Sequence, residues 1–270
     1  MVFFPNAKIN LGLHIVSKRE DGYHNIETVF VPVGWCDVLE VNRSAKDGVA
    51  FTQTGIKVFG DSGTNLCVKA YHLMASLHEI GPVQMHLHKI IPIGAGLGGG
   101  SSDAAFTLLA LNTIFEVGLA EKTLQEYASR LGSDCAFFIR NTPLLATQKG
   151  DQFKPIDVNL KGFFAVIVKP KTSVRTADAY RDVIPLKPEQ SLSAVIKLQA
   201  NRWKGRLNND FENSVFKKHP SVGKIKDKLY AQGAVYASLS GSGSAVYGIF
   251  EKPVDLTSHF RGSTVWQSVL

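Results

Sequence analysis

The stretch that decides the fold is residues 92–105, which read PIGAGLGGGSSDAA. An alternating segment, Val83 to His88, comes before it, and apolar residues at helical spacing, from Ala104 to Phe115, follow it. This order predicts a strand, a glycine-rich loop and a helix. Glycines permit positive φ and let backbone N–H groups approach a ligand without obstruction by a Cβ atom. Because a helix start adds unpaired N–H donors and a positive dipole end, the sequence predicts an anion site here.

Three other interpretations of this loop are weaker. A P-loop is excluded because Ser101, and not a lysine, follows Gly100. The segment Gly94–Gly99 does satisfy the pattern GxGxxG, but a Rossmann strand is buried on both faces and continuously apolar, whereas Val83–His88 alternates. A turn without any ligand is disfavoured, because several adjacent glycines lose much conformational entropy on folding and no bound ligand would offset that cost. The loop therefore favours phosphate binding of another kind.

The composition is that of an ordinary globular enzyme. The chain has 270 residues, of which 44% are hydrophobic and 20% are charged. No apolar run approaches the roughly 20 residues that a transmembrane helix needs, and the first residues lack the order of a signal peptide. We therefore expect a cytoplasmic protein with no membrane partner. The length suggests two domains that share a cleft, residues 1–155 and residues 156–270.

Charge and cysteines add little more. The formal charge of +7 favours anionic partners, but the basic residues are dispersed, which argues against nucleic acid. Cys36, Cys67 and Cys135 are far apart and are expected to stay reduced. His86 and His88 share one strand face, but a metal site there would need further ligands that the sequence does not announce.

The coarse pattern mixes strands and helices without strict alternation, which predicts an α+β fold. Two strands are expected between residues 7 and 41, joined by a turn at residues 18–22. Helices are expected at residues 65–78, after the glycine loop, before Gly132 and between residues 191 and 232. Further strands are expected at residues 163–168, 235–239 and 245–250, with a hairpin between residues 142 and 157.

Three motifs in order resemble those of the GHMP kinases, a family named after galactokinase, homoserine kinase, mevalonate kinase and phosphomevalonate kinase. The first is PNAKINL at residues 5–11, the second is the glycine loop, and the third is SGSGSA at residues 240–245. The resemblance covers nearly the whole chain. It implies an N-terminal domain like the second domain of ribosomal protein S5 and a ferredoxin-like C-terminal domain, with ATP and substrate in the cleft between them.

Three shorter segments resemble one branch of that family. They are DGYH at residues 21–24, GSDCAFF at residues 132–138 and LNNDFE at residues 207–212. This branch phosphorylates the C2 hydroxyl of 4-diphosphocytidyl-2-C-methyl-D-erythritol with ATP and Mg²⁺, in the non-mevalonate isoprenoid pathway. The resemblance thus implies a small-molecule cytidyl diphosphate substrate. It leaves the protein ligands of Mg²⁺ and the oligomeric state unknown.

The resemblance also implies roles for individual residues. Lys8 and Asp134 are the expected catalytic pair, with Asp134 as general base for the substrate hydroxyl and Lys8 holding that carboxylate ionised. The expected ATP-binding residues are Pro92, Ile93, Gly94, Ala95, Gly96, Leu97, Gly98, Gly99, Gly100, Ser101 and Ser102. The expected substrate-binding residues are Asn10, Tyr23, His24, Thr176 and Tyr180, with the cytosine between the two tyrosine rings. Tyr180 stands where related enzymes have Phe, and Ser244 stands where they have proline or alanine.

Plainer interpretations of these residues remain open. By themselves, Asp134 is a turn or cap residue, Lys8 an edge-strand lysine, and the tyrosines ordinary half-buried residues. Three other functions also remain open. One is a GHMP kinase for another small alcohol. The others are an RNA-associated protein with an S5-like domain and a catalytically silent nucleotide-binding regulator.

Overall fold

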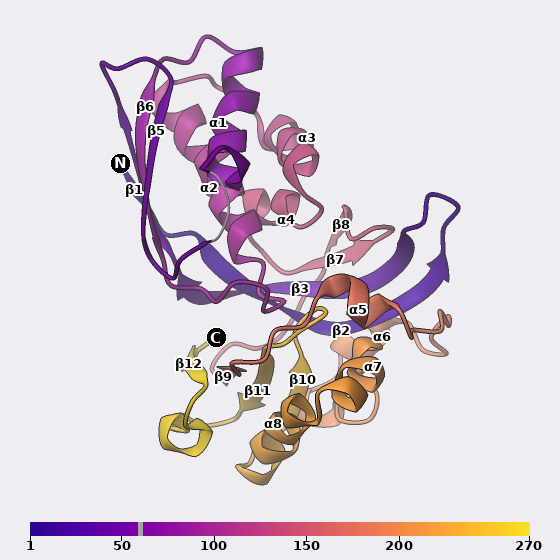
Figure 1. The fold of residues 1–270 in the computed structure, drawn as a ribbon. Helices are drawn as coiled ribbons and strands as arrows, with labels where there is room; N and C mark the ends of the chain where they lie inside the picture. Colours follow the sequence, from indigo (N-terminus) through magenta and orange to yellow (C-terminus); the bar gives the residue numbers. More distant parts are fainter. Residues whose placement is uncertain (59–61) are drawn as a thin grey trace. The chain divides into compact units, whose positions relative to one another are not determined.

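The computed structural model describes residues 1–58 and 62–270, which divide into two compact units (Figure 1). Unit 1 comprises Met1–Ala7, Trp35–Ile93 and Gly98–Thr142, and unit 2 comprises Lys8–Gly34, Gly94–Leu97 and Pro143–Leu270. Both units combine strands with helices, so the predicted α+β class is confirmed. The units interleave along the chain, and the single boundary near residue 155 stays a prediction.

Unit 1 contains a four-stranded sheet with the order β1-β4-β6-β5. Its strands are β1 (Val2–Phe3), β4 (Val38–Arg43), β5 (Val49–Gly55) and β6 (Val83–Lys89). β6 pairs antiparallel with β4 and parallel with β5. Figure 1 shows the helices of this unit on one side of the sheet, namely α1 (Leu66–Leu77), α2 (Gly99–Ile114), α3 (Glu121–Leu131) and α4 (Cys135–Arg140). A short 3-10 turn, η1 (Ser62–Thr64), precedes α1.

The local sequence explains where these elements begin and which face they bury. In β6, Val83, Met85 and Leu87 are buried while the residues between them are not, which confirms the predicted half-buried strand. Helix α1 begins after Asn65, whose side chain accepts a hydrogen bond of 2.8 Å from the backbone N–H of Cys67. Helix α3 ends at Gly132, as predicted.

Unit 2 contains two four-stranded sheets. One has the order β2-β3-β7-β8, with β2 (Asn6–Lys18), β3 (His24–Cys36), β7 (Leu144–Thr147) and β8 (Gln152–Pro155). The other has the order β10-β11-β9-β12, with β9 (Phe164–Lys169), β10 (Tyr236–Leu239), β11 (Val246–Phe250) and β12 (Thr264–Val269). The helical segments are α5 (Thr176–Tyr180), α6 (Leu192–Ile196), η2 (Ala200–Arg202), α7 (Phe211–Lys218), α8 (Pro220–Ala231) and η3 (Thr257–Phe260).

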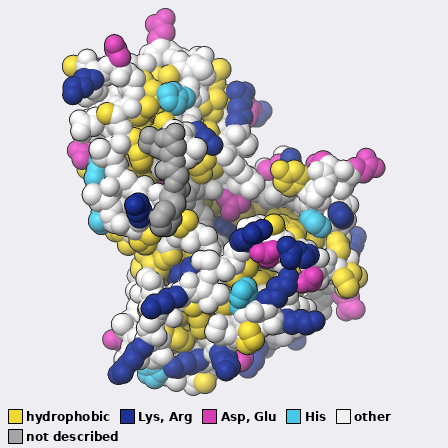
Figure 2. Space-filling view, in the orientation of Figure 1, with side chains coloured by type: hydrophobic (Ala, Val, Ile, Leu, Met, Phe, Trp, Pro, Cys, Tyr) yellow, Lys and Arg dark blue, Asp and Glu magenta, His cyan; other side chains and the backbone are white. Residues whose placement is uncertain are grey.

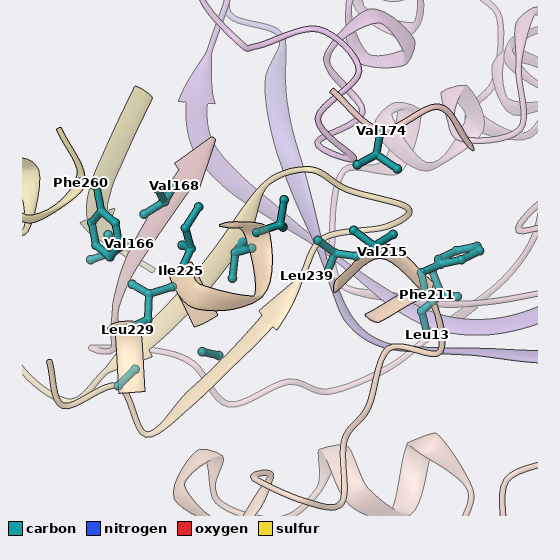
Figure 3. Close-up of a cluster of buried hydrophobic side chains, with 14 of the residues drawn as sticks. Leu13, Val166, Val168, Val174, Phe211, Val215, Ile225, Leu229, Leu239 and Phe260 are labelled. Carbon is teal, nitrogen blue, oxygen red and sulfur yellow. The ribbon is translucent and has the colours of Figure 1, made fainter. Parts of the chain in front are cut away.

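One large apolar core stabilises unit 2. Helix α8 packs against β10 and β11, and its buried residues are Val222, Ile225 and Leu229. Figure 3 shows Ile225 and Leu229 beside Val166 and Val168 of β9, in the cluster to which Val222 also belongs. At the other end of the same cluster, Figure 3 shows Leu13 of β2 beside Phe211 and Val215 of α7. Strand β2 is therefore fixed to this core through burial of apolar surface.

The expected strands, helices and hairpin are present, with shifts of one or a few residues at their ends. Six further strands and α-helices were not predicted, namely β1, β4, β5, β12, α4 and α5. None of the helices formed by residues 1–58 and 62–270 combines the length and the apolar character needed to cross a membrane.

Candidate active site

The start of α2 has the features of an anion site. Gly98 precedes the helix with φ of 72° and, as a glycine, makes no side-chain capping hydrogen bond to the helix N-terminus. The first turn also carries no acidic side chain. The hydroxyl Oγ of Ser102 is buried and has no hydrogen-bond partner in the part of the chain that the structure describes. Free backbone donors, the helix dipole and this hydroxyl together favour a negatively charged ligand at the end of the predicted loop.

A buried cluster of charges lies under the start of α2. The Lys89 ammonium bonds the Asp103 carboxylate at 2.7 Å and also bonds the Asp37 carboxylate. Asp37 accepts hydrogen bonds from the backbone N–H groups of Ile90 and Ile91, where the loop begins. A Cβ atom on Gly99 would lie 2.9 Å from the Lys89 Nζ atom, so only glycine leaves room for this lysine. We name Lys89, Asp37 and Asp103 the charged brace.

The charges of the brace affect one another. Burial raises the pKa of Asp103 to about 7, against the opposing pull of Lys89. Burial by itself would lower the pKa of Lys89, but the two carboxylates outweigh it and raise that pKa. The second carboxylate oxygen of Asp103 is buried without a hydrogen-bond partner among residues 1–58 and 62–270. The brace ties the strand before the loop to the helix after it.

The middle of the loop, Gly94–Leu97, contacts the third motif within unit 2. The backbone N–H of Ala245 donates to the carbonyl of Ala95 at 3.0 Å, and the Ser240 hydroxyl donates to the carbonyl of Gly96 at 2.8 Å. Gly96 has φ of 77°, and a Cβ atom there would lie 1.9 Å from the Ser240 carbonyl oxygen. We call residues 240–244 the second turn. It lies directly against the loop that the sequence predicts to bind phosphate.

Lys8 brings the first motif to the same place. Its side chain is 3% exposed, and its Nζ atom donates to the Asn10 side-chain oxygen at 2.6 Å and to the Gly96 carbonyl at 3.0 Å. The ammonium also lies 4.8 Å from the centre of the Phe30 ring. Lys8 and Asn10 therefore share one face of β2, as the strand period predicts. The plainer interpretation of Lys8 as a solvated edge lysine is wrong.

Asp134 belongs to unit 1 and stands immediately before α4. It is half-buried, and its carboxylate accepts a hydrogen bond of 3.3 Å from the Ser133 hydroxyl but does not cap the helix. The pairing of Asp134 with Lys8 stays a prediction.

The aromatic residues lie in unit 2 in an arrangement that the sequence did not predict. The His24 ring stacks on Tyr180, with ring centres 4.8 Å apart and planes 24° apart, and Phe211 meets Tyr180 edge-on. Tyr23 is 63% exposed, with the Lys149 ammonium 5.4 Å from its ring centre. Burial and the charge of Lys18 lower the pKa of His24.

Thr176 contacts the second turn. Its hydroxyl lies 3.2 Å from the Ser242 hydroxyl, which brings the start of α5 to the turn that contacts Gly96. Of the predicted substrate-binding residues, Asn10 and Thr176 are therefore joined to the loop network. His24 and Tyr180 contact each other, and Tyr23 contacts Lys149.

The sequence alone does not predict a role for several residues of this site. The charged brace gave no signal because its three members are distant in sequence and each fits an ordinary strand or helix position. Lys149 lies in a hairpin turn that the sequence predicts, but nothing in the sequence places it over Tyr23. Ser240 was recognised as part of the third motif without a role of its own.

Outside this site the molecule carries dispersed surface charges and two neighbouring histidines. On the face that Figure 2 shows, Lys and Arg side chains lie at many separate places, with acidic and apolar side chains between them. His86 and His88 hydrogen-bond to Thr52 and Thr54 of β5. Within residues 1–58 and 62–270, no three His, Cys, Asp or Glu side chains gather as a metal site.

Comparison with known proteins gives matches along the whole chain. The family model for the GHMP kinases N terminal domain matches residues 65–141, and the model for GHMP kinases C terminal matches residues 190–258. A 4-diphosphocytidyl-2-C-methyl-D-erythritol kinase of Parabacteroides distasonis is 50% identical over 266 residues, covering 98% of this chain and 96% of the relative. The corresponding kinase of Bacteroides thetaiotaomicron is 51% identical over 268 residues, covering 98% of both chains.

Solved structures agree with this result. A crystal structure of 4-(cytidine 5'-diphospho)-2C-methyl-D-erythritol kinase is similar with a TM-score of 0.85 and 31% identity, covering 99% of this chain and 98% of the other. The mevalonate kinase of Methanococcus jannaschii has a TM-score of 0.72 at 16% identity, covering 99% of this chain and 97% of the other, and so shows the shared fold alone. The predicted family and its two-domain fold are confirmed, and the chain belongs to the GHMP kinases.

Proposed function

We propose that this chain transfers the γ-phosphoryl group of ATP to the C2 hydroxyl of 4-diphosphocytidyl-2-C-methyl-D-erythritol, a step of the non-mevalonate isoprenoid pathway. The observation that carries the proposal is the similarity to kinases of that substrate, at about half of all positions and over nearly the full length of both chains. The fold of a solved kinase of the same kind supports it. Cytoplasmic location and the absence of a nucleic-acid partner stay predictions.

In this proposal the loop residues Pro92–Ser102 hold the phosphates of ATP. The N–H groups at the start of α2 meet the phosphate oxygens, and the helix dipole favours their charge. Phosphoryl transfer depends mainly on positioning and charge stabilisation, so a rigid loop is itself a catalytic device. The charged brace and the second turn supply that rigidity.

Asp134 is the proposed general base, which accepts the proton of the substrate hydroxyl as the bond to phosphorus forms. Lys8 is the proposed electrostatic partner, because its ammonium is buried and fixed by Asn10 and Gly96. A fixed cation in a site of low dielectric stabilises developing negative charge without reorganisation. Asn10 holds the substrate backbone in the same proposal.

Mg²⁺ is the metal that this reaction uses, and the residues of the loop fit it. Mg²⁺ prefers oxygen ligands and is usually held by phosphates together with one or two protein oxygens. The unpartnered Ser102 hydroxyl at the start of α2 is the protein oxygen that suits it, with the phosphates as the main ligands. The metal supplies neutralisation of the phosphate charge. Beyond these donors, the described residues offer no cluster of acidic ligands.

The cytidyl end of the substrate is assigned to Tyr23, His24 and Tyr180, with Thr176 nearby on the same segment as Tyr180. The tyrosine rings stack on the cytosine in this assignment, and His24 recognises its polar edge. Since His24 covers Tyr180 in the structure, the cytosine takes its place on that ring when the substrate binds. Lys149 beside Tyr23 adds a positive charge that suits the diphosphate.

The decisive test compares two acceptors in an assay of ADP formation. The cytidyl substrate should react much more efficiently than methylerythritol phosphate, which lacks the base and cannot use its binding energy to orient the hydroxyl. Tyr23→Ala should raise KM for the cytidyl substrate about tenfold, while Tyr23→Phe keeps the ring and stays close to wild type. Equal efficiency on both acceptors would remove the cytidyl assignment and favour another alcohol.

The role of Asp134 is tested in the same assay. Asp134→Ala should lower kcat by on the order of a hundredfold with nearly unchanged ATP affinity, because the lost interaction belongs to the transition state. Asp47→Ala, which removes an exposed carboxylate of the same unit, is the matched control and should leave both quantities unchanged. Near wild-type turnover of Asp134→Ala would return this residue to a structural role.

A further inference from the structure

Of the segment Leu207–Glu212, which leads into α7, Phe211 contacts a residue of the site described so far. We propose that Asn209 is a positioning residue of the kinase, whose side-chain amide fixes the second turn and through it Gly96 and Lys8. The inference rests on the ATP-dependent activity proposed above. Asn209 itself touches no reacting group in this proposal. It acts through the backbone of the second turn.

The contacts of Asn209 are all to backbone groups, and its side chain is 3% exposed. Its Nδ2 atom donates to the carbonyl of Leu239 at 2.9 Å and to the carbonyl of Gly241 at 2.8 Å. Its Oδ1 atom accepts from the N–H of Phe211 at 3.0 Å. Both amide protons are therefore directed at the two sides of Ser240. An aspartate has the same shape but would present oxygen to both carbonyls.

Glu212 completes the attachment. Its Oε1 atom accepts from the backbone N–H of Leu239 at 2.9 Å and from the Ser238 hydroxyl at 3.0 Å. Its other oxygen pairs with Lys226. The N–H of Leu239 and its carbonyl are thus both held by side chains of one segment. The end of β10, where the second turn begins, has a fixed position relative to α7.

The other side of this segment is fixed to β2, the strand that carries Lys8. The backbone N–H of Leu13 donates to the carbonyl of Asn208, and the N–H of Asp210 donates back to the carbonyl of Leu13, both at 2.9 Å. The Asp210 carboxylate also accepts from the backbone N–H of Ile15 at 2.8 Å. Residues 208–210 therefore set the spacing between β2 and the second turn.

That spacing matters because both partners meet at one carbonyl. The Gly96 carbonyl accepts from the Ser240 hydroxyl and from the Lys8 ammonium. Gly96 also has no room for a Cβ atom against the Ser240 carbonyl, so the loop and the turn are in tight contact. A displacement of the second turn must move either the loop or Lys8. Loss of the Asn209 amide should therefore disturb ATP binding and turnover together.

The test uses the full chain, with ATP affinity measured by titration and kinetics measured with the cytidyl acceptor. Asn209→Ala and Asn209→Asp should each raise KM for ATP about tenfold and lower kcat about tenfold, with a smaller change in KM for the acceptor. The control is Asn208→Ala, which truncates an exposed neighbour and leaves its backbone carbonyl in place, so its values should match wild type. Each kcat is divided by the concentration of ATP-binding sites found in the titration, so that unfolded protein does not lower the value.

A merely structural asparagine gives a different result. It would lower the amount of folded enzyme and leave KM for ATP of the folded fraction unchanged, which would overturn the proposal. If Asn209→Ala yields no folded protein, Asn209→Ser keeps one donor, and its KM for ATP should lie between those of wild type and Asn209→Asp. A Ser value equal to wild type would equally overturn it.

A double mutant tests the route through the second turn. In a Ser240→Ala background the hydrogen bond to Gly96 is already lost, so Asn209→Ala should add clearly less than its single effect on ATP affinity. Full additivity would show that Asn209 does not act through this turn. The nucleotide titration also separates the two hypotheses. If the wild-type chain binds ATP but forms no ADP with the acceptor, the proposed function is refuted. The ATP affinities of wild type and the Asn209 variants can still be compared in that case.

Discussion

The two glycine-rich segments of this kinase are held in place by opposite kinds of chemistry. The start of α2 is held by the charged brace, in which one buried lysine lies between two buried carboxylates. The backbone of the second turn itself is held by an uncharged amide and hydroxyls, namely Asn209, Ser240 and Thr176, while the Glu212 carboxylate holds the N–H of Leu239 just before the turn. Both devices fix backbone that we assign to ATP binding.

This difference predicts how much stability the protein loses when one member of either network is removed. Buried charges are costly to remove from water, so the loss of one member leaves others unpaired and the damage is large. A neutral hydrogen-bond network loses one bond at a time. The charged brace also holds a carboxylate whose pKa lies near neutrality, whereas the amide of Asn209 does not titrate. We expect the brace to be strong and sensitive to pH, and the second turn to be insensitive.

The largest effect should come from Lys89→Met, which leaves two buried carboxylates without their cation. Removing one partner of a buried ion pair typically costs about 3–5 kcal/mol, so this variant should unfold at much lower denaturant concentration than wild type. Lys69→Met, at an exposed position of α1, is the control and should stay within about 0.5 kcal/mol of wild type. A loss below about 1 kcal/mol for Lys89→Met would show that the brace adds little.

A second experiment compares two glycines of the same loop, both with positive φ. Gly94→Ala has no atom within 4 Å of the new Cβ, so it should cost only the backbone term of about 1 kcal/mol. Gly96→Ala also places its Cβ 1.9 Å from the Ser240 carbonyl, so it must push the second turn away.

The readouts are chemical denaturation and ATP titration. Gly96→Ala should lose at least about 2 kcal/mol of stability and about tenfold in ATP affinity. Equal effects of the two substitutions would mean that the loop and the second turn can separate without consequence, which would contradict the tight contact described for Gly96.

The smallest effect concerns pH. The pKa of Asp103 is raised from 3.8 to about 7 in the folded protein, so its contribution to stability is complete below about pH 4 and is lost as the pH rises through about 7. Wild type should therefore lose about 1 kcal/mol of stability between about pH 6 and about pH 8 from this group. Asp103→Asn should stay folded and lack this component.

The measurement is the free energy of unfolding of both proteins at the two pH values. The difference between wild type and Asp103→Asn should change with pH, whereas the difference between wild type and Asn209→Ala should not. A constant difference for Asp103→Asn would show that its carboxylate does not titrate in this range.

The sequence predicts the motifs well but not the devices that support them. The alternation of β2 correctly places Lys8 and Asn10 on one face, because side-chain direction in a strand depends only on local period. The charged brace joins residues 37, 89 and 103, and such a contact depends on how distant segments pack. The same holds for Asn209, which the sequence marks as part of a family segment without indicating its contacts with Leu239 and Gly241.

Two local errors have physical reasons. Helix α4 is not predicted by the sequence: Asp134 lies in the turn after Gly132, as its position alone suggests, but a six-residue helix follows it, in which the apolar residues Cys135–Ile139 are buried. The stacking of His24 on Tyr180 could not be predicted either, since either of the two neighbouring rings, Tyr23 or His24, can face a partner. The shape of a turn decides between them, and the family resemblance carries no such detail.

The interleaving of the two units has a consequence for how the protein is made. The hairpin of β2 and β3 leaves the ribosome well before its partners near residues 208 and 247 of unit 2. The Tyr247 hydroxyl bonds the Asn10 carbonyl across 237 positions of the chain, and Leu13 pairs with Asn208. The last residue of unit 1 is Thr142, so this unit can fold before the later residues of unit 2 are made. Until then the apolar side chains of the hairpin that pack in the core of unit 2, such as Leu13 and Ile15, remain uncovered. Such long-range closure is slow, and a nascent chain of this kinase depends on staying soluble until its final strands emerge.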